Sequence, residues 1–277
     1  MQVVKSYNNN IVLVKTSVGV EQLAIGLGIG FNKKKGDTID PHKILQLFTA
    51  ESSKDVSDLV NVVRSLSTDI ILLTKKVLKI AEEKLPDFHV DDRLLLTLTD
   101  HINYAIERSK QHIFLRNPLI GEIKSLYPTE YKVGLEIIAR IAEETGIEFP
   151  HDEAASIALH IVNSSYDTNE MADVYKVVEI SRSVFTMIKY HYHIELDESS
   201  YHFTRFSTHL KYFILRQISG KKASPMDDNL FEMVKEKYTD AYKCAQRIVE
   251  YLEKQEGWKI SKEEQFYLTI HIHKLIN

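Results

Sequence analysis

Two histidine-centred segments occur twice in this 277-residue chain, in the same order and at nearly the same spacing. Residues 101–108 and 209–216 share the pattern His, aliphatic, x, Tyr, x, Ile, x, Arg. A second segment, from Glu to His over 153–160, is matched over 264–271. The first histidines of the two copies are 108 positions apart and the second histidines 111. A repeat this long predicts a whole duplicated domain rather than a solenoid unit.

The repeat lies in a part of the chain with helical periodicity. From about residue 52, apolar residues recur at i, i+3, i+4 and i+7. Acidic first turns and a capping pattern, with Ser261 three residues before Glu264, support several of the expected boundaries. We expect helical segments over 56–84, 91–109, 118–145, 152–165, 171–193, 198–219, 227–256 and 261–276. The pattern predicts two bundles of about five helices each, one for each copy of the repeat.

The first fifty residues follow a different pattern. Short β-leaning runs are separated by turn residues, and they cover residues 3–4, 11–14, 22–25 and 28–31. They predict a small antiparallel sheet of about four strands, which we expect to bury one face against a second copy of the chain. Gly26, Gly28 and Gly30 alternate, so on a strand they would share one side and let another backbone approach. The fold class expected is therefore α+β and multidomain, a small sheet domain followed by two duplicated all-α bundles.

The net charge of −4 is unevenly divided. Residues 1–50 hold six lysines and three acids, which gives +3, so the remainder of the chain carries −7. A basic head suits a polyanion such as nucleic acid, although ordinary surface variation explains this charge equally well. The single cysteine, Cys244, excludes an internal disulfide framework, and no uncharged stretch approaches the length of a membrane span. We therefore expect a cytoplasmic protein.

The duplication separates four histidines from the other eight. A histidine in an amphipathic helix is usually a partly buried packing residue, and this remains the interpretation of the unduplicated ones: His42, His89, His112, His151, His191, His193, His202 and His273. The two His-x-His pairs do not share a helical face, so metal ligation is not expected. Motifs of the HExxH or nucleophile type are absent from the sequence, and a β-rich head does not suit a helix-turn-helix DNA binder. We expect no enzyme, cofactor or metal site.

Several motifs together resemble one family. They are Asn8-Asn9-Asn10, Gly26-x-Gly-Ile-Gly-Phe31-Asn-Lys-Lys, Thr99-Asp100-His101-Ile102, Asp152-Glu153 with Ala158-Leu159-His160-Ile161-Val162-Asn163, and Leu268-Thr269-Ile270-His271-Ile272. On these motifs the whole chain resembles the BglG/SacY family of transcriptional antiterminators, most closely its LicT-type members. The resemblance implies a co-antiterminator (CAT) RNA-binding domain over 1–56 and two phosphotransferase-system regulation domains (PRDs) over 57–170 and 171–277.

The resemblance also implies a mechanism and its residues. Members of this family bind, as homodimers, a hairpin in a leader mRNA and so prevent a terminator hairpin from forming. Their PRD histidines receive phosphoryl groups from proteins of the sugar phosphotransferase system. In the usual logic, the permease EIIB component phosphorylates the first PRD and inactivates, while HPr phosphorylates the second and activates. Carried onto this sequence, the phosphoryl acceptors are His101, His160, His209 and His271, and the RNA-binding positions are Lys5, Asn8, Asn10, Gly26, Phe31 and Asn32.

Some assignments stay open in the sequence. Phe31 would stack on an unpaired base or, equally, pack in the sheet core. Arg108 and Arg216, seven residues after their histidines, are interpreted as interface ion-pair residues, and Asp100 as a residue that could orient the His101 ring. The family usually has Arg or Lys where this chain has Leu27. The alternative function is therefore a PRD-containing regulatory interaction protein with altered or lost RNA binding.

Overall fold

The computed structural model describes residues 1–49, 66–165, 171–220 and 228–277. By packing, the chain forms two compact units. Unit 1 comprises Met1–Arg116 and Lys132–Ser165, and unit 2 comprises Asn117–Tyr131 and Tyr166–Asn277. The domain boundaries expected after residues 56 and 170 fall within or at the edge of stretches outside the described residues, so they stay predictions.

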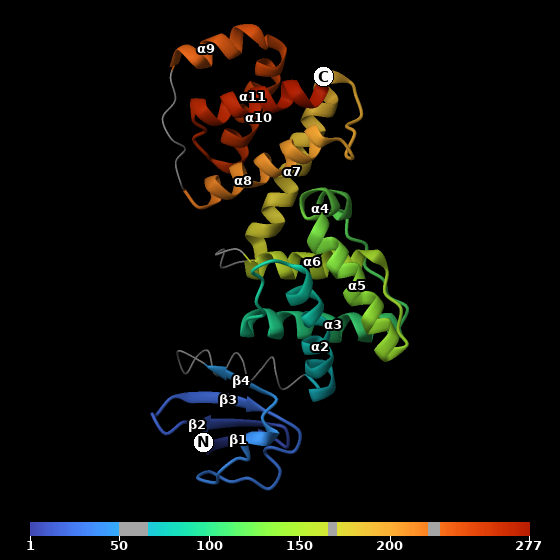
Figure 1. The fold of residues 1–277 in the computed structure, drawn as a ribbon, viewed down its shortest axis with the longest axis vertical. Helices are drawn as coiled ribbons and strands as arrows, with labels where there is room; N and C mark the ends of the chain where they lie inside the picture. Colours follow the sequence, from blue (N-terminus) through green and yellow to red (C-terminus); the bar gives the residue numbers. More distant parts are fainter. Residues whose placement is uncertain (50–65, 166–170, 221–227) are drawn as a thin grey trace. The chain divides into compact units, whose positions relative to one another are not determined.

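Unit 1 begins with a four-stranded antiparallel sheet in the order β1-β2-β3-β4 (Figure 1). The strands are β1 (Gln2–Asn8), β2 (Ile11–Lys15), β3 (Glu21–Ile25) and β4 (Gln46–Thr49). Four consecutive residues of β2, 11–14, are buried, because both faces of this central strand are covered. A small core forms from residues of β1, β2, β3 and the loop that follows: Val3, Val12, Val14, Ala24, Ile29 and Ile39.

The expected strand over 28–31 was wrong. Gly28 has a φ of +65° and Asn32 a φ of +55°, both in the left-handed region, which ends extended structure. Residues 26–31 form consecutive turns, in which Ile29 N donates to Gly26 O and Phe31 N to Gly28 O. The fourth strand is instead β4, reached through a short 3₁₀ helix, η1 (Pro41–Lys43). The sheet was therefore predicted correctly, but its last strand was placed too early.

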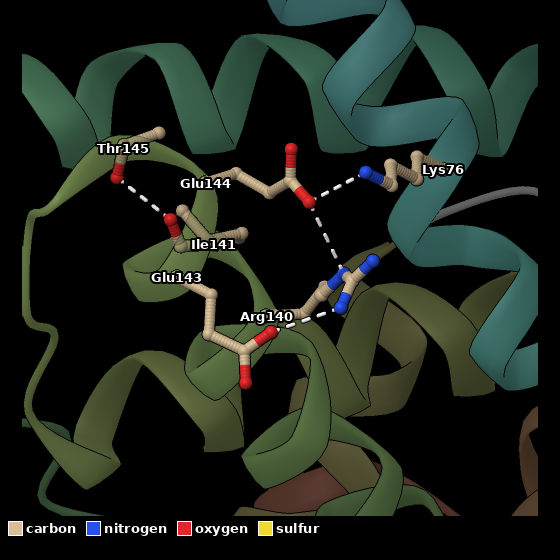
Figure 2. Close-up of polar contacts among 6 residues, drawn as sticks. All are labelled: Lys76, Arg140, Ile141, Glu143, Glu144 and Thr145. Atoms are coloured by element: carbon tan, nitrogen blue, oxygen red, sulfur yellow. Dashed lines mark hydrogen bonds and ion pairs between the residues drawn. The ribbon is translucent and has the colours of Figure 1, made fainter.

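Four helices complete unit 1: α2 (Thr68–Lys84), α3 (Asp92–Lys110), α6 (His151–Ser165) and most of α5 (Pro128–Thr145). Ser67 and Asp91 cap α2 and α3, because their side-chain oxygens accept from the backbone N–H three residues on. Helix α2 packs on α3, and α3 packs on α6. An ion-pair cluster joins α2 to α5 (Figure 2). Glu144 of α5 pairs with Lys76 of α2 and with Arg140 of its own helix.

Unit 2 contains the remaining helices of the described chain. They are α4 (Ile120–Leu126), α7 (Met171–Tyr192), α8 (Tyr201–Ile218), α9 (Asp228–Lys237), α10 (Thr239–Glu256) and α11 (Lys262–Ile276). Helix α11 packs on α8, α9 and α10, and the short α4 packs on α7 and α8. The core is mostly aliphatic and aromatic, with Phe203, Phe206, Ile248 and Ile272 near its centre. In the parts of the chain that are described, every helix is too short or too polar to cross a membrane.

Two expected helices are each divided at a tyrosine. The segment over 118–145 becomes α4 and α5, because Tyr127 leaves the helical region and precedes Pro128, whose ring disfavours a helical residue before it. The segment over 227–256 becomes α9 and α10 at Tyr238, whose ring stacks 4.0 Å from the ring of His273. The start expected near residue 56 lies outside the described residues, and the described part of that helix begins after Ser67.

Candidate functional site

Each copy of the repeat brings its two histidines together on packed helices. In unit 1, α3 carries His101 and α6 carries His160, and their ring centroids lie 5.0 Å apart. In unit 2, α8 carries His209 and α11 carries His271, with ring centroids 4.2 Å apart. The duplicated sequence pattern thus corresponds to two histidine pairs, hereafter the first pair (His101 and His160) and the second pair (His209 and His271).

A buried carboxylate and an arginine accompany the first pair. Glu153 Oε2 lies 3.0 Å from Nε2 of His101, and Glu153 Oε1 accepts from Nη2 of Arg108 at 2.9 Å. Both Glu153 and Arg108 have side chains only 8% exposed, whereas the His101 side chain is 21% exposed. The guanidinium of Arg108 also lies over the Tyr104 ring, 5.0 Å from its centroid. One carboxylate therefore contacts both a histidine and an arginine.

The equivalent groups around the second pair are arranged differently. Arg216 donates from Nε and Nη2 to both oxygens of Glu264, in three hydrogen bonds of 2.9–3.0 Å. Glu264 is buried, but the Arg216 side chain is 40% exposed. His209 is exposed and His271 is buried. In this copy the carboxylate is occupied by the arginine in a forked pair, the strong geometry for arginine and carboxylate.

These arrangements shift the two glutamate pKa values in opposite directions. Burial alone would raise the pKa of Glu153, but the contact with His101 and the charges of His101 and Arg108 outweigh burial, so the pKa is lowered. Burial raises the pKa of Glu264, and Arg216 offsets that rise only in part. The difference comes from a second cationic or hydrogen-bonding neighbour, which Glu153 has and Glu264 lacks.

Three of the four histidines have pKa values below the ordinary value for histidine. Burial and the neighbouring His101 lower the pKa of His160 to about 3. Burial, with His209 as the next cause, lowers the pKa of His271 to about 4. Burial and the nearby charges of Arg205 and Arg216 lower the pKa of His209. At neutral pH these imidazoles therefore have a nitrogen lone pair available, which is what a phosphoryl acceptor needs.

The arginine and carboxylate assignments made from sequence need correction. Arg108 and Arg216 were expected at an interface, but each pairs with a glutamate of its own unit. Asp100 was considered as the residue that orients His101, but the carboxylate in contact with that ring is Glu153. Glu153 and Glu264 were noted only as the starts of repeated segments. Their recurrence at the same distance before each second histidine was the signal that could have identified them.

A separate candidate surface lies on the sheet domain, where two turns are hydrogen-bonded together. Asn8 Oδ1 accepts from Asn10 N at 2.8 Å, and Asn10 Oδ1 accepts from Gly28 N at 2.9 Å. The backbone adds bonds from Gly26 N to Asn10 O and from Gly30 N to Asn9 O. A Cβ on Gly26 would lie 1.8 Å from the carbonyl oxygen of Lys43, so the position admits glycine only. Residues 8–10 and 26–32 therefore form one ordered surface, here called the turn surface.

The remaining RNA-binding candidates lie on or near this surface. Phe31 is 60% exposed and Leu27 56% exposed, so the sheet-core interpretation of Phe31 was wrong. Asn32 is exposed at the end of the turn surface. Lys5 is exposed on β1, with its ammonium 5.0 Å from the centroid of the Tyr7 ring. The Lys33 side chain donates to Thr38 O, so this lysine is held by its own loop.

The other histidines show no comparable pair in the described ranges. His191 Nδ1 lies 3.1 Å from Arg247, and its other nitrogen lies 3.6 Å from Asp240. His273 stacks on Tyr238. Across the described parts of both units, no group of three or more His, Cys, Asp or Glu side chains is placed to hold a metal ion.

Comparison with known proteins identifies the same modules. Residues 1–57 match the CAT RNA binding domain, and residues 59–164 and 182–275 each match the PRD domain. The chain is 35% identical to the transcription antiterminator LicT of Bacillus subtilis (strain 168), over 100% of this chain and 99% of that protein. It is 34% identical to the beta-glucoside operon antiterminator of Dickeya chrysanthemi, over 99% of this chain and 96% of that protein.

A solved structure gives a partial match. The crystal structure of GlcT CAT-PRDI is 30% identical and covers 58% of this chain and 96% of that chain, with a TM-score of 0.48. The relatives are antiterminators, which are regulators and not enzymes. The full-length matches and the order of the modules show that the chain belongs to the BglG/SacY family of transcriptional antiterminators, with a CAT RNA-binding domain followed by two PRDs.

Proposed function

We propose that this protein binds a hairpin in a leader mRNA as a homodimer, prevents formation of a terminator, and is switched by phosphorylation of His101, His160, His209 and His271. The phosphoryl donors are HPr and a sugar-permease EIIB component of the phosphotransferase system. The observation that carries the proposal is the duplicated histidine pair, each with a buried Glu and an Arg partner, in a chain that begins with a CAT RNA binding domain.

The histidine pairs have the chemistry that a phosphoryl switch requires. A phosphoryl group adds nearly two negative charges and three strong acceptor oxygens. In a pair whose rings lie 4.2–5.0 Å apart, this charge would be placed beside a second ring and, at His101, also beside the buried carboxylate of Glu153. The packing of the two helices must then change, or the arginine must turn toward the phosphate. Either response connects a single covalent event to the arrangement of a bundle.

The turn surface supports the RNA-binding half of the proposal. Exposed Phe31 offers a face on which an unpaired base can stack, and stacking contributes about 1–3 kcal/mol per base. Asn32 and Lys5 add an amide and a cation nearby in the same domain. Asn8 and Asn10 hold the turns together through their side-chain oxygens, which leaves their amide nitrogens for base edges.

Leu27 favours a second candidate function, a regulator with altered or lost RNA binding. Its exposed apolar side chain lies on the turn surface, where a cation would attract phosphate. Without a cation at position 27 to contact phosphate, the affinity for RNA is lower, but the Phe31 ring is still available for base stacking. The two candidates therefore differ in affinity and in salt dependence.

The test is a salt-titrated binding assay of the full-length protein with an RNA hairpin that has two internal loops. We expect Phe31→Ala to weaken binding about 5- to 100-fold, the equivalent of one lost stacking contact. Leu27→Arg should tighten binding and steepen the logarithmic salt dependence by about one unit. Val18→Ala, at another exposed apolar residue of the sheet domain, serves as the matched control and should change neither. Absence of wild-type binding, with binding restored by Leu27→Arg, would favour the second candidate.

Phosphorylation is tested separately with purified donor proteins and radioactive phosphate. Each His→Ala change at the four positions should remove its own share of acid-labile incorporation. His202→Ala, at an exposed unduplicated histidine of α8, should remove none. Incorporation that survives the combined loss of all four histidines would refute the assignment.

A further inference from the structure

The two nitrogens of His101 lie in different environments. Nε2 is buried and 3.0 Å from Glu153 Oε2, an ion-pair distance at which the two atoms do not meet hydrogen-bond geometry. Nδ1 is not among the buried nitrogens, and no hydrogen bond to it occurs within the described residues. Nδ1 is therefore the less buried of the two ring nitrogens.

The charge on Glu153 determines where the proton of the ring lies. The lowered pKa of Glu153 keeps its carboxylate ionised at neutral pH. An ionised carboxylate attracts a proton and repels a lone pair, so at 3.0 Å its charge favours the ring form with the proton on the facing Nε2. In the neutral ring the lone pair is then on Nδ1. Nδ1 of His101 is therefore both the less buried nitrogen and the one that carries the lone pair.

His160 shows the opposite pattern, although it lies beside His101. Its Nδ1 is buried and has no hydrogen-bond partner among the described residues. The nitrogen left for reaction is Nε2. In the second pair, Glu264 is bonded to Arg216, and no carboxylate of the described residues contacts either ring. The tautomer-fixing contact is thus a property of His101.

We propose that Glu153 is a positioning residue that makes Nδ1 of His101 the phosphoryl acceptor. This inference rests on the proposed phosphorylation of that histidine. The Nδ1 lone pair attacks the phosphorus of a phosphohistidine or phosphocysteine protein, and the Nδ1–P bond forms as the donor N–P or S–P bond breaks. A protonated donor ring leaves as neutral imidazole, or the donor cysteine leaves as thiolate. His101 keeps its Nε2 proton throughout, so its ring becomes cationic.

The position of Glu153 suits that product. The positive charge that develops on the ring appears next to an ionised, buried carboxylate, where the low dielectric strengthens the attraction. A neutral residue at position 153 would leave this charge without a partner. Loss of one charge-assisted contact of this kind corresponds to a slowing of about 10- to 100-fold.

The first measurement concerns the unphosphorylated full-length protein. Long-range proton–nitrogen NMR with ¹⁵N-labelled histidine should show the Nε2–H form for His101. Glu153→Ala should give a mixture of tautomers, and Glu264→Ala, the matched change in the second pair, should leave His101 unaltered. A wild-type His101 protonated at Nδ1 in its neutral ring overturns the proposal whether or not any histidine is phosphorylated.

The second measurement identifies the phosphorylated nitrogen. Potassium phosphoramidate, a small donor, and the EIIB component are each used with a variant in which His160, His209 and His271 are all replaced by Ala, and the phosphorus–nitrogen coupling locates the bond on His101. We expect Nδ1 on wild-type His101, and the same nitrogen with slower reaction in Glu153→Gln, which keeps the shape without the charge. Glu153→Gln also guards against unfolding of the alanine variant. Phosphate on Nε2 of His101 overturns the inference and leaves the proposed function intact. Reaction at Nδ1 with phosphoramidate but none with EIIB overturns the proposed phosphorylation of His101 and leaves the assignment of the reactive nitrogen intact.

Discussion

The two histidine pairs derive from one sequence template, yet their electrostatics differ. Around the first pair, a carboxylate buried together with its arginine contacts the accessible histidine. Around the second, the carboxylate is taken up by a half-exposed arginine in a forked pair, and His209 is exposed. The contrast shows that a duplicated motif preserves the residues while burial and pairing determine how each copy titrates and reacts.

Removal of the arginines should produce the largest difference between the two copies. Arg108→Ala leaves Glu153 as a buried charge paired, within the described residues, with His101 alone, and breaking a buried pair destabilises by about 3–5 kcal/mol. Arg216→Ala should lower the stability of unit 2 by about 1–3 kcal/mol, since water reaches the arginine side of that pair.

Two optical signals separate these effects in urea titrations. The only tryptophan, Trp258, packs against the core of unit 2, so its fluorescence reports on that unit, while circular dichroism reports on all helices. Arg108→Ala should shift the dichroism transition and leave the fluorescence midpoint in place. Equal effects of the two substitutions on their own units would contradict the contrast in burial.

Acid should weaken both copies, and the first over a wider pH range. The folded pKa values of His160 and His271 lie below the ordinary 6.5, so the unfolded chain binds more protons below that pH. The free energy of unfolding is therefore unaffected by these two histidines above about pH 6.5. Below that pH it falls, by up to about 1.4 kcal/mol per pH unit for each histidine. The loss should end near pH 4 for His271 and continue toward pH 3 for His160.

The neutral substitutions His160→Gln and His271→Gln give the control. Each should flatten the pH dependence of its own unit only, measured by the same two signals between pH 7 and about pH 3. An unchanged slope in either variant would show that the acid loss comes from other groups.

The smallest expected difference concerns a glycine that only the first copy has. A Cβ at Gly134 in α5 would lie 2.3 Å from the carbonyl oxygen of Ala154 in α6, whereas the position 111 residues later is the buried Ala245. Gly134→Ala should therefore destabilise unit 1 by about 1–3 kcal/mol through overpacking. Ala245→Gly should lower the stability of unit 2 by about 1 kcal/mol through lost helix propensity. A stabilised Gly134→Ala protein would mean that α5 and α6 can move apart.

The sequence predicted the features that repeat and missed those made by contacts across the chain. The four histidines were identified because their spacing recurs, and the sheet because turn residues separate its runs. The Arg108–Glu153 pair spans 45 residues and depends on how α3 meets α6, which no local pattern encodes. The false strand over 28–31 had the right composition, but Gly28 and Asn32 take left-handed conformations, and Asn10 in the neighbouring turn holds Gly28 through a hydrogen bond to its N–H.

The bonds between the two turns of the sheet domain also affect the entropy of recognition. Asn8, Asn10 and the glycine backbone hold residues 26–30 in place within the folded domain. The conformational freedom of this loop is therefore lost when the chain folds, and little remains to be lost when a ligand arrives. Asn10→Ala would return that freedom to the loop, so a ligand would have to order it and would bind more weakly even where the side chain at position 10 makes no contact with it.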